Sequence, residues 1–400
     1  MPQFRTLDDL DPTGRRVLVR ADLNVPVKDG RVTDSTRIER LAPTVTALLD
    51  KGARVVVMSH FGRPKGPDPA QSLRPLVEPL SKALGGRTVQ FAPDCIGPEA
   101  ERVVAALKPG EVALLENLRF HKGEEANDLE FAKQLARLGD LYVDDAFSAA
   151  HRAHASIAAL AHLLPAAAGL NMQAELDALG AALENPQRPL IALIGGAKVS
   201  TKLDLLQSMI AKVDRLAIGG AMANTFLFAE GRPVGRSLCE RDLADTARAI
   251  RAAAAKRGCE IILPEDAVTA EKLEAGVATR TVGVNAVPPT AMILDIGPDT
   301  TRRIAAALEA SRTLVWNGPL GVFETPPFDR GTIAVARKAA ELTRTGRLMS
   351  VAGGGDTVAA LHAAGVADDF SYVSTAGGAF LEWLEGRELP GVAALATAPG

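Results

Sequence analysis

Short apolar runs alternate with amphipathic segments along the whole chain. The runs have the length of strands and occupy residues 16–20, 54–58, 112–115 and 141–143 in the first half, and 189–194, 215–218, 260–263, 292–295, 313–316 and 348–352 in the second. Most of them end in a polar or glycine-rich turn before a helical pattern begins. This alternation predicts an α/β protein with parallel sheets that helices cover on both faces.

One amphipathic segment separates the two series of runs. Its apolar residues Met172, Leu176, Leu179 and Leu183 are spaced by four, three and four positions, which places them on one face of a helix. We expect this helix to end near Asn185. A chain of 400 residues is too long for one compact core. We therefore predict two domains with this helix between them.

Composition narrows the classes of partner. Apolar residues make up 47% of the chain and charged residues 23%, as is usual for globular proteins. The formal net charge of −3 gives no indication of nucleic acid or of a membrane surface as a partner. The cysteines, Cys95, Cys239 and Cys259, lack the spacing of a metal site and fit a reducing compartment.

The N-terminal region indicates where the protein resides. Its first residues lack the apolar core of a signal peptide. The longest apolar stretch, residues 155–170, is interrupted by His162 and Pro165 and is too short to span a bilayer. These features predict a cytoplasmic protein.

In the first half, polar and basic residues follow several of the predicted strands. These residues are Asp22, Asn24, His60, Arg63, Arg119 and Arg152, and Arg37 lies in the first turn of the helix expected over 36–50. Strand ends of a parallel sheet meet at one edge, so the arginines and His60 can converge there on an anion. Alternatively, Asp22 and Asn24 serve local turns, and His151 and His154 are more simply interpreted as structural.

The second half contains a glycine–lysine turn, residues 195–202. It connects an apolar run to a helical pattern at Leu203, Leu206 and Ile210, a geometry that directs backbone N–H groups at an anion. We expect Lys198 and Lys202, four positions apart, to share one face near the start of that helix. The alternative is an ordinary turn with two solvated lysines. The spacing is not that of a Walker motif.

Further glycine turns follow the later runs. They contain Gly219 and Gly220, then Gly318, Pro319 and Glu324, then Gly353, Gly354, Gly355, Asp356 and Thr357, and finally Gly377 and Gly378. Asp356 is either a helix N-cap or a ligand of a divalent cation that bridges phosphates. Lysines, amides and one acid suit a nucleotide polyphosphate with magnesium, whereas the arginines of the first half suit a small polyanionic substrate.

These stretches together resemble phosphoglycerate kinase. The resemblance covers residues 12 to 395 and rests on eight motifs in the family's order, namely 19–26, 59–64, 116–120, 145–154, 195–202, 315–324, 353–357 and 385–391. It implies two Rossmann-like domains joined by a long helix, with a cleft between them. The first would comprise 1–168 with a return segment 384–400 and bind phosphoglycerate, and the second, 169–383, would bind nucleotide.

The resemblance also implies a reaction and roles for residues. The activity would be reversible phosphoryl transfer from 1,3-bisphosphoglycerate to ADP, giving 3-phosphoglycerate and ATP in glycolysis, by a monomer whose domains close on a hinge for in-line transfer. Phosphoglycerate would be bound by Asp22, Asn24, Arg37, His60, Arg63, Arg119 and Arg152. Arg37 and Lys202 would be catalytic. The nucleotide would be bound by Lys198, Lys202, Gly219, Gly220, Gly318, Pro319, Glu324 and residues 353–357. Asp356 would hold Mg²⁺, and Gly377 and Gly378 would face phosphate when the domains are closed.

The chain departs from the family pattern at a few positions. Asp144 stands in place of a usual asparagine, Ser148 in place of a glycine, Ala221 and Ala376 in place of glycines, and Asn171 in place of a leucine. None of these changes removes a charged group of the implied site.

Two other functions are weighed against this one. A nicotinamide-dependent dehydrogenase would need a Gly-x-Gly-x-x-Gly turn followed by an acid about 20 residues later, and no stretch of the chain supplies this. A non-catalytic protein that binds sugar phosphates or nucleotides would not need the full set of cationic residues, all of which are present.

Overall fold

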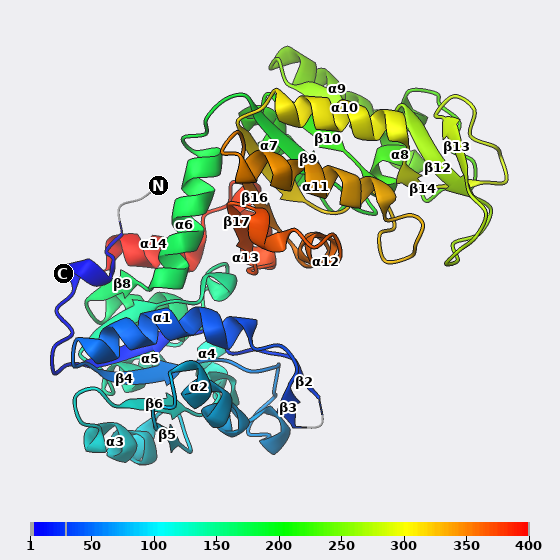
Figure 1. Ribbon diagram of the computed structural model, residues 1–400. Helices are drawn as coiled ribbons and strands as arrows, with labels where there is room; N and C mark the ends of the chain where they lie inside the picture. Colours follow the sequence, from blue (N-terminus) through cyan, green and yellow to red (C-terminus); the bar gives the residue numbers. More distant parts are fainter. Residues whose placement is uncertain (1–3, 29, 399–400) are drawn as a thin grey trace. The chain divides into compact units, whose positions relative to one another are not determined.

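The computed structural model describes residues 4–28 and 30–398 and contains two compact units (Figure 1). Residues Met1–Leu176 and Glu388–Gly400 form the first unit, and Asp177–Arg387 form the second. The chain passes from the first unit to the second within helix α6 (Leu170–Leu183). The apolar residues predicted for one face of this helix, Met172, Leu176, Leu179 and Leu183, are all buried.

The first unit is built on a parallel sheet of six strands in the order β5-β6-β4-β1-β7-β8. The strands are β1 (Arg16–Arg20), β4 (Arg54–Met58), β5 (Val89–Ala92), β6 (Val112–Leu115), β7 (Leu141–Asp144) and β8 (Ala166–Ala168). A short antiparallel pair, β2 (Val27–Lys28) and β3 (Arg31–Val32), lies outside this sheet. The central strands are buried almost throughout, as expected for a sheet covered on both faces.

Helices of the first unit cover this sheet. They are α1 (Thr36–Asp50), α2 (Val77–Ala83), α3 (Gly97–Ala106), α4 (Lys122–Glu125), α5 (Leu129–Ala136) and, from the end of the chain, α14 (Pro390–Thr397). Apolar residues of α1 and α2 pack with alternate valines of β1 and β4 into one core. Helix α1 has the bounds predicted from the sequence, and Arg37 lies in its first turn.

The second unit repeats this plan and adds a small sheet. Its six parallel strands, in the order β11-β10-β9-β15-β16-β17, are β9 (Leu190–Ile194), β10 (Arg215–Ile218), β11 (Glu260–Ile262), β15 (Thr313–Asn317), β16 (Met349–Gly353) and β17 (Tyr372–Ser374). The added antiparallel sheet contains β12 (Asp266–Ala270), β13 (Arg280–Gly283) and β14 (Met292–Ile296). The run at 292–295 therefore does not belong to the parallel sheet, which corrects that part of the sequence prediction.

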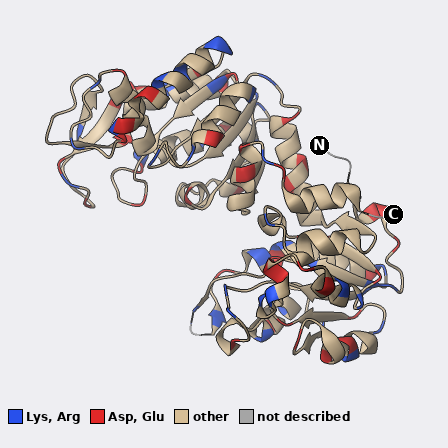
Figure 2. Ribbon diagram, turned by 180° about the vertical axis from the view of Figure 1, so that it is seen from behind, with Lys and Arg blue, Asp and Glu red and all other residues tan. Residues whose placement is uncertain are grey.

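The helices of the second unit are α7 (Leu203–Lys212), α8 (Gly220–Ala229), α9 (Ala244–Lys256), α10 (Pro298–Glu309), α11 (Arg330–Arg344), α12 (Gly355–Ala363) and α13 (Gly378–Leu384). Residues of α10, α11 and α12 pack with β9 and β15 around the buried indole of Trp316. No helix within the described part of the chain is long and apolar enough to cross a membrane. Figure 2 shows Lys and Arg interspersed with Asp and Glu over both units.

Candidate active site

Loops at the carboxyl ends of β1, β4, β6 and β7 bring a cationic cluster together in the first unit. Neighbouring parallel strands end at the same edge of the sheet, so residues far apart in sequence meet there. Arg20 contacts His60, and Arg119 contacts the Gly62 oxygen in the turn that follows His60. Arg37 contacts the backbone of Asn24, whose side chain also contacts that turn. Arg37, His60 and Arg119 therefore lie at one edge of the sheet, while a shared anion site with Arg63 and Arg152 stays a prediction.

Asp22 holds Arg37 at this edge. Its Oδ2 lies 2.9 Å from Arg37 Nη1, and the same nitrogen donates to the backbone oxygen of Asn24 at 2.8 Å. The Ser148 hydroxyl also donates to Asp22 Oδ2. Asp22 thus positions a cation rather than presenting a bare carboxylate, and Ser148, one of the departures from the family pattern, takes part in holding it.

His60 is buried and neutral. Its Nδ1 accepts a hydrogen bond from Arg20 Nη2 at 3.2 Å, and burial together with the charges of Arg20 and Arg119 holds its pKa well below the usual value. Arg20 is completely buried; its Nε donates to Ser156 Oγ at 2.8 Å, and Ser156 Oγ donates to Glu124 Oε1 at 2.6 Å. In its neutral form, His60 can donate from Nε2 to an anion.

Asn117 fixes the two turns that frame the cluster. Its Oδ1 accepts from the backbone N–H groups of Phe61 and Arg119, and its Nδ2 donates to the Phe61 oxygen at 2.7 Å. Arg119 Nη1 in turn donates to the Gly62 oxygen at 2.6 Å. Asn24 Oδ1 accepts from the Gly62 N–H at 3.0 Å. The turn before Arg63 is therefore anchored by two other site residues.

The remaining arginines of the cluster differ in their contacts. Arg152 Nε donates to His151 Nε2 at 3.2 Å. Burial lowers the pKa of Arg119, Glu125 opposes this shift, and the charges of Arg20 and then Arg152 add to it. Arg63 is exposed, and within the described chain its side chain has no hydrogen bond or ion pair. A phosphate or carboxylate could therefore engage Arg63 without breaking an existing contact.

The second unit contains a largely apolar cavity of about 330 Å³. Its wall includes several residues predicted for the nucleotide, namely Gly220, Pro319, Glu324 and Asp356. Leu238, Leu273, Met292 and Leu294 provide apolar surface, and Ala221, another departure, also lines it. A cavity with apolar walls and a few polar groups is typical of sites for small molecules with an aromatic part.

Lys202 is held beside this cavity. Its Nζ donates to the Gly195 oxygen at 2.6 Å and to Asn317 Oδ1 at 2.7 Å. Burial lowers the pKa of Lys202 to about 8, although the charge of Asp356 opposes this shift. The ammonium of Lys202 is poorly hydrated and contacts only neutral oxygens, so a bound anion would stabilise its charged form strongly.

Glycines allow the backbone to pass closely around Lys202. A Cβ on Gly195 would lie 1.8 Å from the Pro319 oxygen, and one on Gly318 would lie 3.0 Å from Lys202 Nζ. Gly318 and Gly354 have positive φ angles of 95° and 96°. These turns therefore require glycine both for space and for backbone conformation.

Asn317 and Thr357 connect the glycine turns. Asn317 Nδ2 donates to the Gly353 oxygen at 2.8 Å, while the Thr357 hydroxyl accepts from the Gly318 N–H at 2.6 Å. Thr357 is buried, so its side chain supports the turn, and only its backbone N–H at the start of α12 is suited to a ligand. Asn317 was not among the predicted site residues, although it directly follows the predicted run 313–316 and ends β15.

Of the residues predicted for the nucleotide, those other than Gly220, Pro319, Glu324 and Asp356 do not line the cavity, and Lys198, Gly377 and Gly378 differ most from expectation. Lys198 is exposed, and α7 begins at Leu203, so the two lysines do not share a helix face as expected. Residues 199–202 form a turn in which Thr201 Oγ1 donates to the Lys198 oxygen. Gly377 and Gly378 begin α13 and are not part of the wall of the cavity.

Other residues could be found only from the structure. Arg20 ends β1 and reads in sequence as part of a strand, whereas Glu124 and Ser156 lie in segments with no motif; all three are buried beneath the cationic cluster. A charged residue within an otherwise apolar run was the one available signal for Arg20. The contacts among these residues join positions 20, 124 and 156, which sequence spacing does not predict.

Comparison with known proteins gives a consistent result. The family model described as phosphoglycerate kinase matches residues 7–387. Phosphoglycerate kinase from Methylorubrum extorquens strain PA1 is 63% identical over 397 residues, which cover 99% of each chain. That from Rhodospirillum centenum is 63% identical over 393 residues, which cover 98% of this chain and 99% of the relative.

Solved structures of phosphoglycerate kinases are also similar to this chain. The phosphoglycerate kinase structure from Coxiella burnetii has a TM-score of 0.91 and 42% identity over 98% of this chain and 99% of that one. The structure from Pyrococcus horikoshii OT3 has a TM-score of 0.82 and 31% identity over 98% of each chain. With a cationic site in one α/β unit and a lysine-flanked cavity in the other, the chain belongs to the phosphoglycerate kinase family.

Proposed function

We propose that the cationic cluster of the first unit binds phosphoglycerate and that the cavity and glycine turns of the second bind the nucleotide. The reaction of the family is phosphoryl transfer between 1,3-bisphosphoglycerate and ADP, which yields 3-phosphoglycerate and ATP in glycolysis. Membership of this kinase family leaves no place for the dehydrogenase or the non-catalytic alternative. The best support for a nucleotide site in the second unit is the position of Lys202. This desolvated lysine is held beside the cavity by Gly195 and Asn317.

In the first unit, we assign phosphoglycerate to the cations at the sheet edge. Arg37, Arg63, Arg119 and Arg152 offer guanidinium groups, which match the planar oxygens of carboxylate and phosphate. His60 offers a neutral N–H. Asp22 and Asn24 contribute by orienting Arg37 and the turn before Arg63.

In the second unit, we assign the base to the apolar cavity and the phosphates to the surrounding backbone amides. Glu324 is exposed at the cavity wall, where its carboxylate can accept from ribose hydroxyls. Gly219, Gly220, Gly318 and Pro319 form the turns around the base, and the N–H groups of 353–357 suit phosphate oxygens. Lys202 would contact the transferring phosphoryl group, with Lys198 as a supporting charge and Gly377 and Gly378 as further amide donors.

Mg²⁺ is part of this proposal, with Asp356 as its protein ligand. The Asp356 side chain is exposed at the start of α12 and lines the cavity, and it has no hydrogen bond or ion pair within the described chain. A single free carboxylate beside phosphates is the setting that Mg²⁺ commonly occupies, with water and phosphate oxygens as its other ligands. When bound, the ion would supply neutralisation of phosphate charge.

Phosphoryl transfer then needs positioning more than covalent help from the protein. The attacking carboxylate of 3-phosphoglycerate is already ionised, so no general base is required. Arg37 and Lys202 would stabilise charge on the transferring group. Because each ligand belongs to one unit, in-line transfer requires a closed state in which the ligands meet and water is excluded; this closure is part of the proposal.

A coupled assay with 3-phosphoglycerate and MgATP tests the assignment. Arg37→Ala and Lys202→Ala should each lower kcat by roughly two to three orders of magnitude, because each removes a charge from the transferring group. Lys133→Ala, on the exposed side of α5, is the matched control and should keep full activity. Circular dichroism and thermal melting check that the variants fold. Near-normal turnover in either site variant would remove the assigned role of that residue.

The cytoplasmic location and the monomeric state are also proposals. The location rests on the sequence features described above, and the monomer rests on the usual state of the family. Light scattering coupled to gel filtration would measure the mass in solution, for comparison with 41.9 kDa for one chain. Cell fractionation would test the location.

A further inference from the structure

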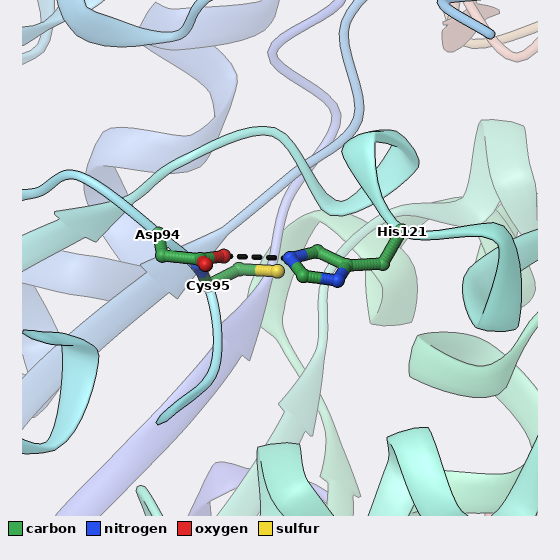
Figure 3. A group of neighbouring side chains, drawn as sticks. All are labelled: Asp94, Cys95 and His121. Carbon is green, nitrogen blue, oxygen red and sulfur yellow. Dashed lines mark hydrogen bonds and ion pairs between the residues drawn. The ribbon is translucent and has the colours of Figure 1, made fainter. Parts of the chain in front are cut away.

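A cysteine, a histidine and an aspartate meet at a second place in the first unit (Figure 3). Asp94 and Cys95 lie between β5 and α3, and His121 directly follows the short helix η4 (Leu118–Phe120), which comes after β6. Strands β5 and β6 are parallel neighbours, so their carboxyl-terminal loops lie next to each other. Figure 3 shows the three side chains pointing toward one another from these two loops.

The donor atoms are close enough for one ion. The Cys95 sulfur, a His121 ring nitrogen and an Asp94 carboxylate oxygen all lie within 4.8 Å of one another, and His121 Nε2 is 2.7 Å from Asp94 Oδ1. In a tetrahedral zinc site, bond lengths of about 2.0 to 2.3 Å place ligand atoms roughly 3.5 Å apart. Small side-chain rotations that open the His–Asp contact and bring the sulfur nearer would produce that spacing.

We propose that Asp94, Cys95 and His121 form a binding site for a zinc-class divalent cation, separate from the site proposed for Mg²⁺. Sulfur, imidazole and carboxylate together are the ligand set of Zn²⁺ and not of Mg²⁺, which prefers oxygen. With a thiolate and a carboxylate, the two negative charges balance the charge of the ion. The site therefore buries no uncompensated charge.

The surroundings support binding and access. The His121 ring stacks on Phe131 with centroids 5.5 Å apart, which limits its rotation. The Cys95 sulfur is buried, whereas the His121 and Asp94 side chains are 31% and 45% exposed. An ion can thus enter from the exposed side and complete its coordination with water, in the manner of three-ligand sites with an open position. Across the described residues this is the one group of three His, Cys, Asp or Glu side chains that meets the spacing for a metal.

Binding exchanges a thiol proton for the metal. The S–H bond of Cys95 is lost, a sulfur–metal bond forms, and the proton leaves to solvent. One proton is therefore released for each ion bound.

Cobalt titration of the whole protein, first stripped with a chelator and then kept in excess Mg²⁺, tests this site. Co²⁺ bound to a thiolate gives a ligand-to-metal absorption band that oxygen ligands do not give. We expect one equivalent of Co²⁺ to produce this band and Zn²⁺ to remove it by competition. Cys95→Ser should abolish the band, and His121→Gln, a change at a partly exposed position, should weaken Co²⁺ binding at least tenfold.

Cys259→Ser is the matched control, since Cys259 is also a buried free thiol but has no such neighbours. This variant should keep both the band and the affinity. The proposal is overturned if the native protein gives no thiolate band, if the band survives in Cys95→Ser, or if it disappears in Cys259→Ser. Thermal melting of each variant without metal confirms that any loss of the band does not arise from unfolding.

Discussion

At the scale of single residues, burial changes the chemistry of Lys202. Its ammonium is surrounded by backbone and amide oxygens, and its pKa is lowered to about 8 because desolvation penalises the charged form. An unfolded chain has no such environment, so this lysine would lose its charge far more easily in the folded protein. A role in binding phosphate requires the charged form.

This environment predicts the alkaline limb of the pH profile. The kcat/KM for nucleotide should fall as pH rises through about 8, because that parameter reports the free enzyme and Lys202 loses its proton there. In Lys202→Arg the alkaline limb should move to higher pH, because the guanidinium group stays charged there. This shift is expected even if the maximal rate changes. Steady-state assays from neutral to alkaline pH measure this limb. An identical limb in both proteins would show that another group sets it.

A second prediction concerns Asp144, which stands where the family usually has asparagine. It is completely buried, and its Oδ2 has no hydrogen-bond partner within the described chain. Burial raises its pKa from 3.8 to about 6. Folding therefore disfavours the charged form of Asp144. Its contribution to stability is full below the pKa of the unfolded chain, 3.8, and is lost as the pH rises through the pKa of the folded protein, about 6.

Asp144→Asn should remove that pH dependence. Between low and neutral pH, the free energy of unfolding of the variant should rise by up to about 3 kcal/mol relative to that of the native protein, since one pKa unit corresponds to about 1.4 kcal/mol. If the new amide destabilises the fold, it does so equally at every pH, so the change with pH is unaffected. Asp140→Asn gives the opposite control, because the hydrogen bonds and charge of Arg16 lower the Asp140 pKa. Urea unfolding across pH measures both differences, and parallel curves for Asp144→Asn and the native protein would contradict the prediction.

At the scale of elements, the glycine turns of the second unit depend on close backbone contact. Gly195→Ala would place a Cβ 1.8 Å from the Pro319 oxygen and 2.8 Å from the Gly318 oxygen, both of them backbone atoms. The turn at 318–319 would have to move. We expect a loss of about 1 to 3 kcal/mol in the free energy of unfolding, as for other overpacked sites, together with weaker nucleotide binding.

Gly355→Ala is the matched control for stability. It lies in a neighbouring glycine turn, but a Cβ there meets no atom within 4 Å and its φ angle is not positive. Its unfolding free energy should stay close to that of the native protein. Denaturant unfolding compares the two variants. Equal free energies of unfolding would show that the 318–319 turn can move with little loss of stability.

The strands and helices were predictable wherever the apolar pattern was regular. Helix α1 and the central strands of both sheets were expected from sequence because burial on one or both faces imposes a period on the residues. The antiparallel sheet of β12, β13 and β14 was not expected, because the run that forms β14 is equally compatible with a parallel strand. Lys198 was wrongly placed on a helix, since the turn 199–202 interrupts the pattern before α7.

The residue types and strand ends of the candidate site could be proposed from the sequence, but its supporting contacts could not. Resemblance indicated Arg37, His60 and Lys202 by position. The groups that orient them, such as Arg20, Asn117 and Asn317, meet only through the fold. Cys95 likewise showed no metal spacing in sequence, because His121 reaches it from the next strand of the sheet.

At the scale of the whole molecule, the candidate substrate sites fall in different units. All lining residues of the cavity belong to the second unit, and the cationic cluster belongs to the first. Each substrate should therefore bind without the other. Binding stabilises the region that forms the contacts, because a ligand favours the folded state to which it binds.

Hydrogen exchange should reveal this division. 3-Phosphoglycerate alone should slow amide exchange at Asn24, Gly62 and the turn of Arg119, while MgATP alone should slow it at Gly196, Gly318 and Gly354. In Arg37→Ala, the effect of 3-phosphoglycerate should be lost and that of MgATP retained, because the two sites share no residue. Peptide-resolved exchange followed by mass spectrometry measures all three cases. Protection of the Arg119 turn by MgATP alone would contradict the assignment, since it would place a nucleotide contact in the first unit.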